Sequence, residues 1–169
     1  MEFTDHHVGR LFETIESMGI ADNTLIYYII GDNGASAEGS FNGCYNEMSY
    51  FNGLQALETA EYLTERMDKL GGPESYNHFA VGWAHAMNTP YQWTKQVASH
   101  WGGTRNGTIV HWPKGVKGKG EIRSQFSHVI DVAPTVLEAV GLPAPKIVNG
   151  TPQIPMEGTS LVYTFDNAA

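Results

Sequence analysis

Residues 25–39, LIYYIIGDNGASAEG, place six consecutive apolar residues directly before the polar tetrad Gly31-Asp32-Asn33-Gly34. The run from Thr24 to Ile30 is β-branched and aromatic without polar alternation, which favours a central strand of a parallel sheet covered on both faces. Asn-Gly is also a frequent hairpin signal, so the tetrad could form a tight turn. The alternative is a binding site at the end of a buried strand.

Composition limits the class of protein. The chain has 169 residues, 41% of them apolar, which is the size of one domain with a real core. A formal net charge of −8 argues against nucleic acid as a partner and favours a solvated acidic surface over a cation site. No apolar run approaches the roughly 18 residues of a membrane helix, so we expect no membrane partner and no signal peptide. Cys44 is the single cysteine, which excludes an internal disulfide.

Apolar periodicity predicts an α/β chain. Helical spacing predicts helices over residues 4–19, 54–70 and 127–142, and strands are expected over 24–30 and 108–113. The first helix and the strand after it form half of an α/β unit.

Three segments lack such periodicity. Residues 31–53 form a loop rich in Gly, Asn and Ser, and residues 73–107 form a long aromatic irregular segment. Loops of this length inside a compact domain are usually functional. The tail over 143–169 carries one short apolar run, at 161–163.

The polar tetrad offers ligands for a hard cation. In open α/β sheets, ligands gather beyond the carboxyl ends of the strands. The Asp32 carboxylate and the Asn33 amide provide oxygen donors of the kind that Ca²⁺ or Mg²⁺ binds. Two donors are fewer than such ions require. From spacing alone, a structural turn is therefore favoured over a metal site, and both remain open.

A second set of polar residues lies in residues 89–113, TPYQWTKQVASHWGGTRNGTIVHWP. Lys95 is a point charge suited to an anionic oxygen, and Arg105 is a planar fork suited to an oxyanion. His100 lies between them. Residue types alone favour a structural interpretation, with a solvated lysine, an arginine ion pair and a turn at Gly102-Gly103.

Taken in order along the chain, these segments resemble the sulfatase family, and within it the bacterial arylsulfatase-like enzymes. The matching stretches are DHHVGRLFETIESMGIADNT, LIYYIIGDNG, TPYQWTK, GGTRNGTIVHWP, SHVIDVAPTVLEAVGL and MEGTSL. The resemblance covers essentially the whole chain. It implies that residues 1–169 are the truncated later part of one catalytic domain, without its N-terminal half. The implied fold is a partial alkaline-phosphatase/sulfatase-like sheet flanked by helices, with long irregular loops.

The resemblance implies roles for three residues. Asp32 and Asn33 match the pair that provides two ligands of a divalent cation, usually Ca²⁺, and Lys95 matches the lysine that contacts the sulfate oxygens. Cation and lysine would neutralise the oxygens of a small-molecule sulfate monoester as charge builds in the transition state. In an intact parent, a hydrated formylglycine would attack sulfur and expel an alcohol or phenol.

The chain also departs from the family pattern. It has no Cys-x-Pro-Ser-Arg signature for the formylglycine nucleophile, and Cys44, within NGCYNE, is interpreted as an ordinary loop or core thiol. His100 stands where a glutamate usually precedes the glycine pair. We interpret it as structural rather than catalytic, and His85 as a further candidate ten residues before Lys95. The earlier acidic pair of the metal shell is missing, so we expect the chain alone to be inactive.

Two alternatives remain. One is a metal-dependent phosphatase or phosphodiesterase of the same superfamily, for which further Asp/His clusters would be needed. The other is an inert fragment that forms a homo-oligomer through an exposed sheet edge or apolar surface. The sequence leaves open the substrate and the compartment, bacterial cytoplasm or periplasm.

Overall fold

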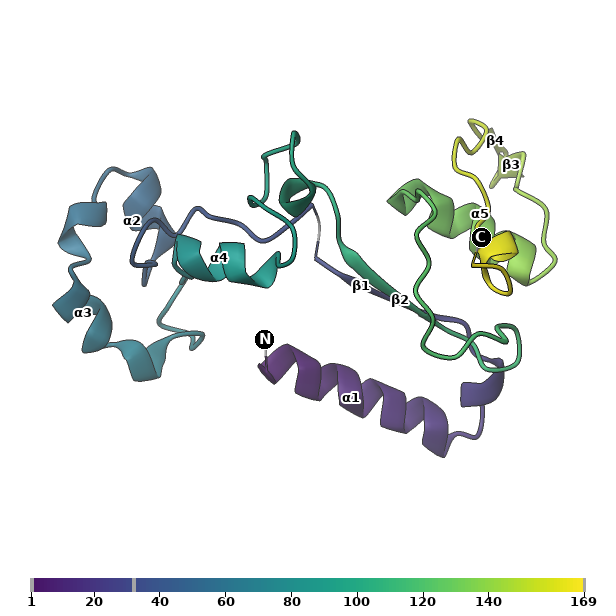
Figure 1. The fold of residues 1–169 in the computed structure, drawn as a ribbon, viewed down its shortest axis with the longest axis horizontal. Coiled ribbons are helices and arrows are strands. Elements are labelled where there is room, and N and C mark those ends of the chain that lie inside the picture. Colours follow the sequence, from purple (N-terminus) through teal and green to yellow (C-terminus); the bar gives the residue numbers. More distant parts are fainter. Residues whose placement is uncertain (1, 32, 169) are drawn as a thin grey trace. The chain divides into compact units, whose positions relative to one another are not determined.

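A computed structural model describes residues 2–31 and 33–168 of the chain. The described residues form two compact units (Figure 1). The terminal unit contains the residues up to Tyr27 and those from Ile109 onward, and the central unit contains residues 28–108.

Short helices and strands alternate with long loops along the chain. The elements are α1 (Glu2–Ser17), β1 (Ile26–Ile30), α2 (Glu47–Phe51), α3 (Ala60–Thr64), α4 (Val81–Met87), β2 (Gly107–His111), α5 (Val132–Ala139), β3 (Ile147–Val148) and β4 (Thr151–Pro152). The predicted helices at 4–19 and 127–142 and the predicted strands are confirmed to within a few residues. In the described residues, no helix combines the length and apolar character needed to cross a bilayer.

β1 differs from the expected central strand of a parallel sheet. It pairs with β2 alone among the described residues. The amide of Lys114, beyond the end of β2, bonds to the carbonyl of Asp22, before β1, whereas Gly107 at the start of β2 lies beside Ile30. The pair is therefore antiparallel. Ile30 is 45% exposed, so the strand is not covered on both faces. A run of apolar residues indicates burial but does not determine strand direction or the number of partners.

The predicted helix over 54–70 is wrong as one element. The structure has a short 3₁₀ turn at Gln55–Leu57, then α3, then a second turn at Met67–Lys69. The Glu58 carboxylate accepts hydrogen bonds from the backbone amides of Tyr45 and Asn46, which draws residue 58 out of a helical path. The Thr59 hydroxyl then caps α3 by accepting from the amide of Tyr62, at 3.2 Å.

The segments predicted as irregular contain two short helices. α2 lies within 31–53 and is capped by Asn46, whose side chain accepts from the amide of Met48. α4 lies within 73–107 and carries the buried Ala84. The other described residues of both segments are mostly loop, with a 3₁₀ turn at Trp101–Gly103 and isolated bridges that pair Cys44 with His78 and Asn46 with Tyr76.

In the terminal unit, the segment around Thr159 packs on the helix that begins near Asp131. The Asp131 carboxylate accepts from the amides of His128 (2.7 Å) and Thr159 (2.8 Å). The fully buried Thr135 hydroxyl donates to the Asp131 carbonyl (2.6 Å) and accepts from the amide of Leu161 (2.8 Å). These bonds join two of the stretches that carry the family resemblance.

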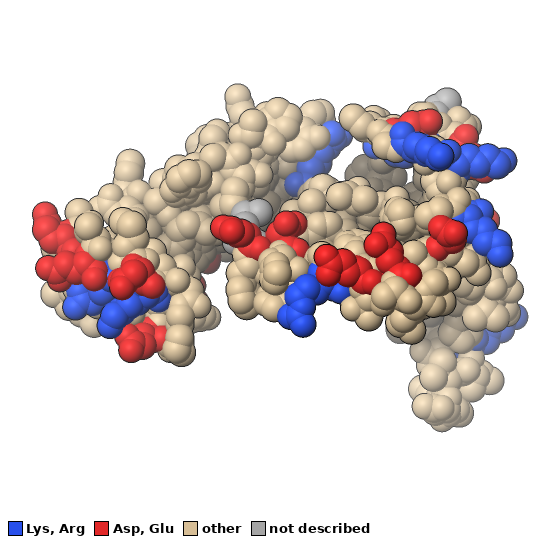
Figure 2. All heavy atoms as spheres, turned by 90° about the horizontal axis from the view of Figure 1, so that it is seen from below, with Lys and Arg blue, Asp and Glu red and all other residues tan. Residues whose placement is uncertain are grey.

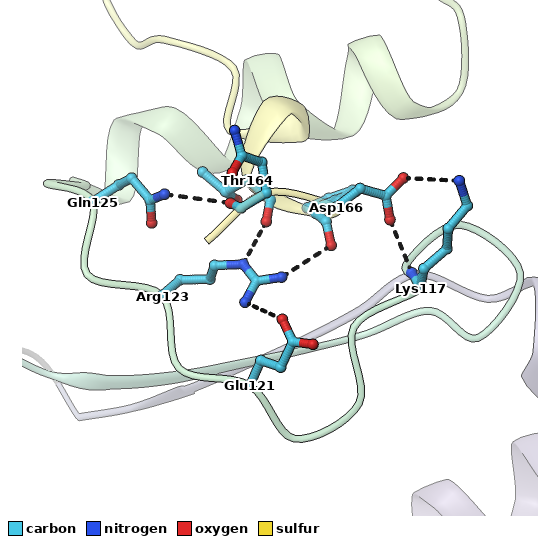
Figure 3. A network of polar contacts seen from close by, with 8 residues as sticks. Lys117, Glu121, Arg123, Gln125, Thr164 and Asp166 are labelled. Carbon is cyan, nitrogen blue, oxygen red and sulfur yellow. Dashed lines mark hydrogen bonds and ion pairs between the residues drawn. The ribbon is translucent and has the colours of Figure 1, made fainter. Parts of the chain in front are cut away.

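Arg123 fixes the end of the tail to the same unit (Figure 3). Its guanidinium donates to the carbonyls of Thr164 and Phe165 and pairs with Glu121 at 2.8 Å. The tail also contains an antiparallel hairpin, β3–β4, whose turn residues Asn149 and Gly150 have φ values of 49° and 80°.

Charge is spread over the surface. Figure 2 shows acidic side chains recurring across one face with basic side chains between them. This distribution fits the solvated acidic surface expected from the net charge of −8.

Candidate functional site

Within the central unit, the loop after β1 lies against the loop that carries Lys95. The backbone amide of Lys95 donates to the carbonyl of Ala35 at 2.9 Å. A Cβ built on Gly34 would lie 3.1 Å from the Lys95 nitrogen. The structure therefore brings the two polar segments of the sequence together. The side chains of Asn88 and Asn106 join them through bonds to residues that lie 53 and 72 positions earlier in the sequence. We call this contact the loop junction.

Asn88, at the C-terminal end of α4, links both sides of the loop junction. Its Oδ1 atom accepts from the amide of Ala35 at 2.9 Å, and its Nδ2 atom donates to the carbonyl of Trp93 at 2.9 Å. One half-buried amide side chain thus satisfies a backbone donor on one loop and a backbone acceptor on the other.

The Asn33-Gly34 pair adopts a left-handed backbone but does not form a hairpin turn. Their φ values are 57° and 91°. The amide of Gly34 donates to Oδ1 of Asn106 at 3.0 Å, just before β2, rather than closing a turn between paired strands. The Asn33 side chain is exposed. The hairpin interpretation of this pair is therefore wrong, and the geometry leaves the Asn33 amide available to solvent.

Lys95 lies between two residues with unusual backbone conformations. Trp93 has φ 68° and Gln96 has φ 75°, in the left-handed region that side chains rarely adopt. The Gln96 side chain donates to the Glu38 carboxylate at 3.0 Å, which ties the Lys95 loop to the Asn33 loop a second time. Thr94 is buried and Lys95 is half-buried.

The two histidine candidates occupy different positions. His100 is half-buried in the Lys95 loop, where its Nδ1 atom lies 2.9 Å from the Ser99 hydroxyl and its ring lies 5.6 Å from the Trp93 ring. His85 is exposed on α4.

Arg105 stacks on aromatic rings, and it forms no ion pair with another of the residues that the structure describes. Its guanidinium carbon lies 3.8 Å from the centre of the Trp101 ring and 5.5 Å from that of Tyr91. These rings border a shallow hollow beside the loop junction, which is lined by Pro90, Tyr91, Gln92, Ser99, His100 and Trp101.

The donor set for a cation is only partly described. Asp32 lies outside the described residues. In the remainder of the chain, no three His, Cys, Asp or Glu side chains lie close enough to hold a metal ion. Asn33 presents one exposed amide oxygen, a ligand type that suits Ca²⁺. The donors of this segment fit a divalent cation in type, and further ligands have to come from other residues.

Cys44 has the character of a core thiol, as expected. It is 7% exposed, and its backbone exchanges hydrogen bonds with His78 in both directions. Burial raises the pKa of the Cys44 thiol, and Glu58 and Glu47 raise it further, while the bond from the His78 backbone lowers it. A raised pKa leaves little thiolate at neutral pH, which is the opposite of an activated nucleophile.

Sequence reasoning missed Asn88, Asn106 and Glu38. Each holds the loop junction through its side chain, but none belongs to a motif. A weak signal was present, since Asn88 follows the apolar residues of α4, where Asn commonly ends a helix.

The chain matches known proteins along most of its length. Residues 1–142 match the family described as Sulfatase. The chain is 30% identical over 157 residues to an arylsulfatase from Klebsiella aerogenes, an alignment that covers 93% of this chain and 31% of that protein. It is 28% identical over 148 residues to an uncharacterized sulfatase from Schizosaccharomyces pombe, covering 86% of this chain and 24% of that protein.

The chain thus spans about a quarter to a third of the length of these curated relatives. Its mixture of helices and strands fits part of a sulfatase domain. From the family match over residues 1–142 and the arylsulfatase relative, we conclude that this chain belongs to the sulfatase family.

Proposed function

We propose that this chain supplies the cation and sulfate contacts of an arylsulfatase-type enzyme that hydrolyses sulfate monoesters. Asp32 and Asn33 would be ligands of Ca²⁺ or another divalent cation, and Lys95 would contact the sulfate oxygens. Membership of the sulfatase family supports sulfate ester hydrolysis as the reaction of the lineage. Arylsulfatase is the name of one relative, and the aromatic rings beside the Lys95 loop are compatible with an aryl ester.

The observation that carries the proposal is the loop junction. Two segments that the resemblance assigns to one site are joined by the Lys95–Ala35 backbone bond and by both ends of the Asn88 amide. These three bonds hold the two loops against each other. A fixed position for Lys95 relative to the Asn33 backbone is what a shared oxyanion site requires.

The chemistry assigned to Lys95 follows from its charge. An ammonium group donates up to three hydrogen bonds and stabilises the negative charge that grows on the sulfate oxygens as the ester bond breaks. A bound divalent cation would polarise the same oxygens as a Lewis acid. Because Lys95 is half-buried, its interaction with a sulfate group is screened less than that of an exposed lysine.

The nucleophile is not assigned to this chain. The sequence contains no Cys-x-Pro-Ser-Arg stretch, and the buried Cys44 has a raised thiol pKa. We therefore expect these 169 residues alone to bind ligands without turnover.

The test is a sulfate titration of the 169-residue chain followed by nuclear magnetic resonance. Inorganic sulfate should shift the signals of the Lys95 loop saturably, and Lys95→Gln should abolish the saturation. Lys69→Gln is the matched control, because Lys69 is an exposed lysine of the same unit that pairs with Glu74. Equal sulfate affinity in all three proteins would refute the assignment of Lys95.

A chromogenic aryl sulfate tests whether the chain alone can hydrolyse a sulfate ester. We expect no release of the phenol by the chain alone. Turnover that survives removal of Cys44 would show that a nucleophile exists among residues we have not considered.

A further inference from the structure

Three glycines of the central unit lie where backbone segments of the loop junction touch. Gly34 precedes Ala35 in the Asn33 loop, and Gly102 and Gly103 follow His100 in the Lys95 loop. Gly102 and Gly103 are buried. At each position, the space that a Cβ atom would fill is already occupied by a carbonyl oxygen of the junction.

Gly34 is constrained in two ways. Its φ of 91° is a conformation that L side chains rarely adopt. A Cβ on Gly34 would also overlap the carbonyl oxygen of Gly102. Because Gly34 has no Cβ, the Asn33 loop can approach the Lys95 loop closely enough for the Lys95–Ala35 bond at 2.9 Å.

Gly102 and Gly103 close the Lys95 loop from the other side. A Cβ on Gly102 would overlap the carbonyls of Gln92 and Trp93, and the Gly102 amide donates to the Gln92 carbonyl at 2.9 Å. A Cβ on Gly103 would overlap the carbonyl of Val97. The glycine pair therefore touches the backbone before and after Lys95, which is more than the simple turn considered from the sequence.

We propose that Gly34, Gly102 and Gly103 are positioning residues that set the place of Lys95 relative to Asn33. This inference rests on the proposed function of those two side chains. The three glycines leave room for the two loop backbones to touch, and this contact fixes the position of one loop relative to the other. A Cβ at any of them separates the cation contact from the sulfate contact without touching either side chain.

The backbone around Lys95 supports the same conclusion. Residues held in left-handed conformations persist where the surroundings over-determine them, and they concentrate at functional sites. Trp93 and Gln96, on either side of Lys95, are both held this way by side-chain bonds from Asn88 and to Glu38. A loop needed only as a connection would not require two such residues around one lysine.

The first test is amide hydrogen exchange of the full chain and two variants. Gly34→Ala and Gly102→Ala should each raise the exchange rate of the Lys95 amide by about tenfold or more, since its acceptor on Ala35 moves away. Gly43→Ala is the matched control. Gly43 also has a positive φ, 80°, and a Cβ there would crowd the carbonyl of His78, in the same unit but outside the junction. This variant should leave the exchange rate of the Lys95 amide unchanged.

The second test distinguishes positioning from general destabilisation. The affinity for inorganic sulfate is measured with and without Ca²⁺. In the wild type, Ca²⁺ should increase the affinity severalfold, because both ligands meet at the junction. Gly34→Ala should bind each ion separately and lose this increase, whereas Gly43→Ala should keep it.

The outcomes separate this proposal from the proposed function. A wild type that binds neither ion refutes the proposed function, and the exchange rates then decide whether the glycines position Lys95. Unchanged Lys95 exchange in both Gly34→Ala and Gly102→Ala would overturn the proposal. An equal increase of the Lys95 exchange rate in Gly43→Ala would overturn it as well.

Discussion

Asn88→Ala should open the loop junction without unfolding the central unit. The substitution removes the acceptor of the Ala35 amide and the donor to the Trp93 carbonyl, both at 2.9 Å. It adds no atoms and creates no steric conflict. The junction therefore loses the free energy of two hydrogen bonds and of the packing of a few side-chain atoms.

The expected magnitude follows from those bonds. An intramolecular hydrogen bond contributes about 0.5–1.5 kcal/mol net, and Asn88 is half-buried, so water replaces part of the loss. We expect the junction to be weaker by about 1–2 kcal/mol, which corresponds to a roughly 5- to 30-fold increase in the open population.

Amide hydrogen exchange measures this population directly. The Lys95 amide, bonded to the Ala35 carbonyl, should exchange faster by that factor in Asn88→Ala, and the Ala35 amide should also exchange faster because it loses its acceptor. The Cys44 amide, bonded to the His78 carbonyl at 2.9 Å, should keep its rate. Asn77→Ala is the matched control, because the Asn77 side chain also accepts from a backbone amide, that of Gly71.

Two results would contradict this role of Asn88. Unchanged exchange at Ala35 and Lys95 would show that the bonds of Asn88 do not hold the loops together. A uniform loss of protection that includes Cys44 would show that Asn88 stabilises the whole unit rather than the junction.

Three further predictions concern stability and association. Thr135→Val should lower the free energy of unfolding of the terminal unit by about 1–3 kcal/mol in urea denaturation, since the Leu161 amide loses its acceptor, and Thr135→Ser should lower it less. Hydrogen bonds from the amides of Thr159 and His128 lower the pKa of Asp131. The contribution of Asp131 to stability is therefore complete above about pH 4 and is lost as the pH falls through the folded-state pKa. Asp131→Asn should make the free energy of unfolding depend less on pH in this range, and an unchanged dependence would contradict the role of Asp131. The isolated chain should self-associate through exposed apolar side chains such as Ile29 and Ile30, and light scattering that shows a monomer at all concentrations would contradict this.

The sequence predicted the elements that depend on local patterns. Helix α1 and the region of α5 follow from apolar spacing, and Pro134 lies in the first turn of α5 as expected. The strand β1 follows from its β-branched and aromatic run. The strand β2 was predicted as well, but its antiparallel pairing with β1 was not, because strand direction is determined by the path of the chain between the strands.

The failure at residues 54–70 has a specific cause. The apolar spacing there is helical, but the Glu58 carboxylate bonds to two amides of a different segment, at Tyr45 and Asn46. These bonds satisfy backbone donors just before α2, and they place Glu58 outside a helix, between the 3₁₀ turn and α3. Local periodicity carries no information about a partner more than ten residues away.

The candidate site was predicted only in part for the same reason. The resemblance identified Asn33 and Lys95, which the structure places on two loops in contact. Asn88 and Asn106 hold those loops through side-chain bonds to residues 53 and 72 positions away. No spacing rule connects such residues, so they emerge only from the folded chain.

We propose that the Asp32-Asn33 segment binds a divalent cation, and calorimetric titration of the chain with Ca²⁺ measures this binding. Asp32→Ala and Asn33→Ala are compared with Asp68→Asn, which changes an exposed carboxylate of the same unit. We expect saturable binding in the wild type and in Asp68→Asn, and none in the other two variants. The absence of binding in the wild type, or equal affinity in all four proteins, would contradict the claim.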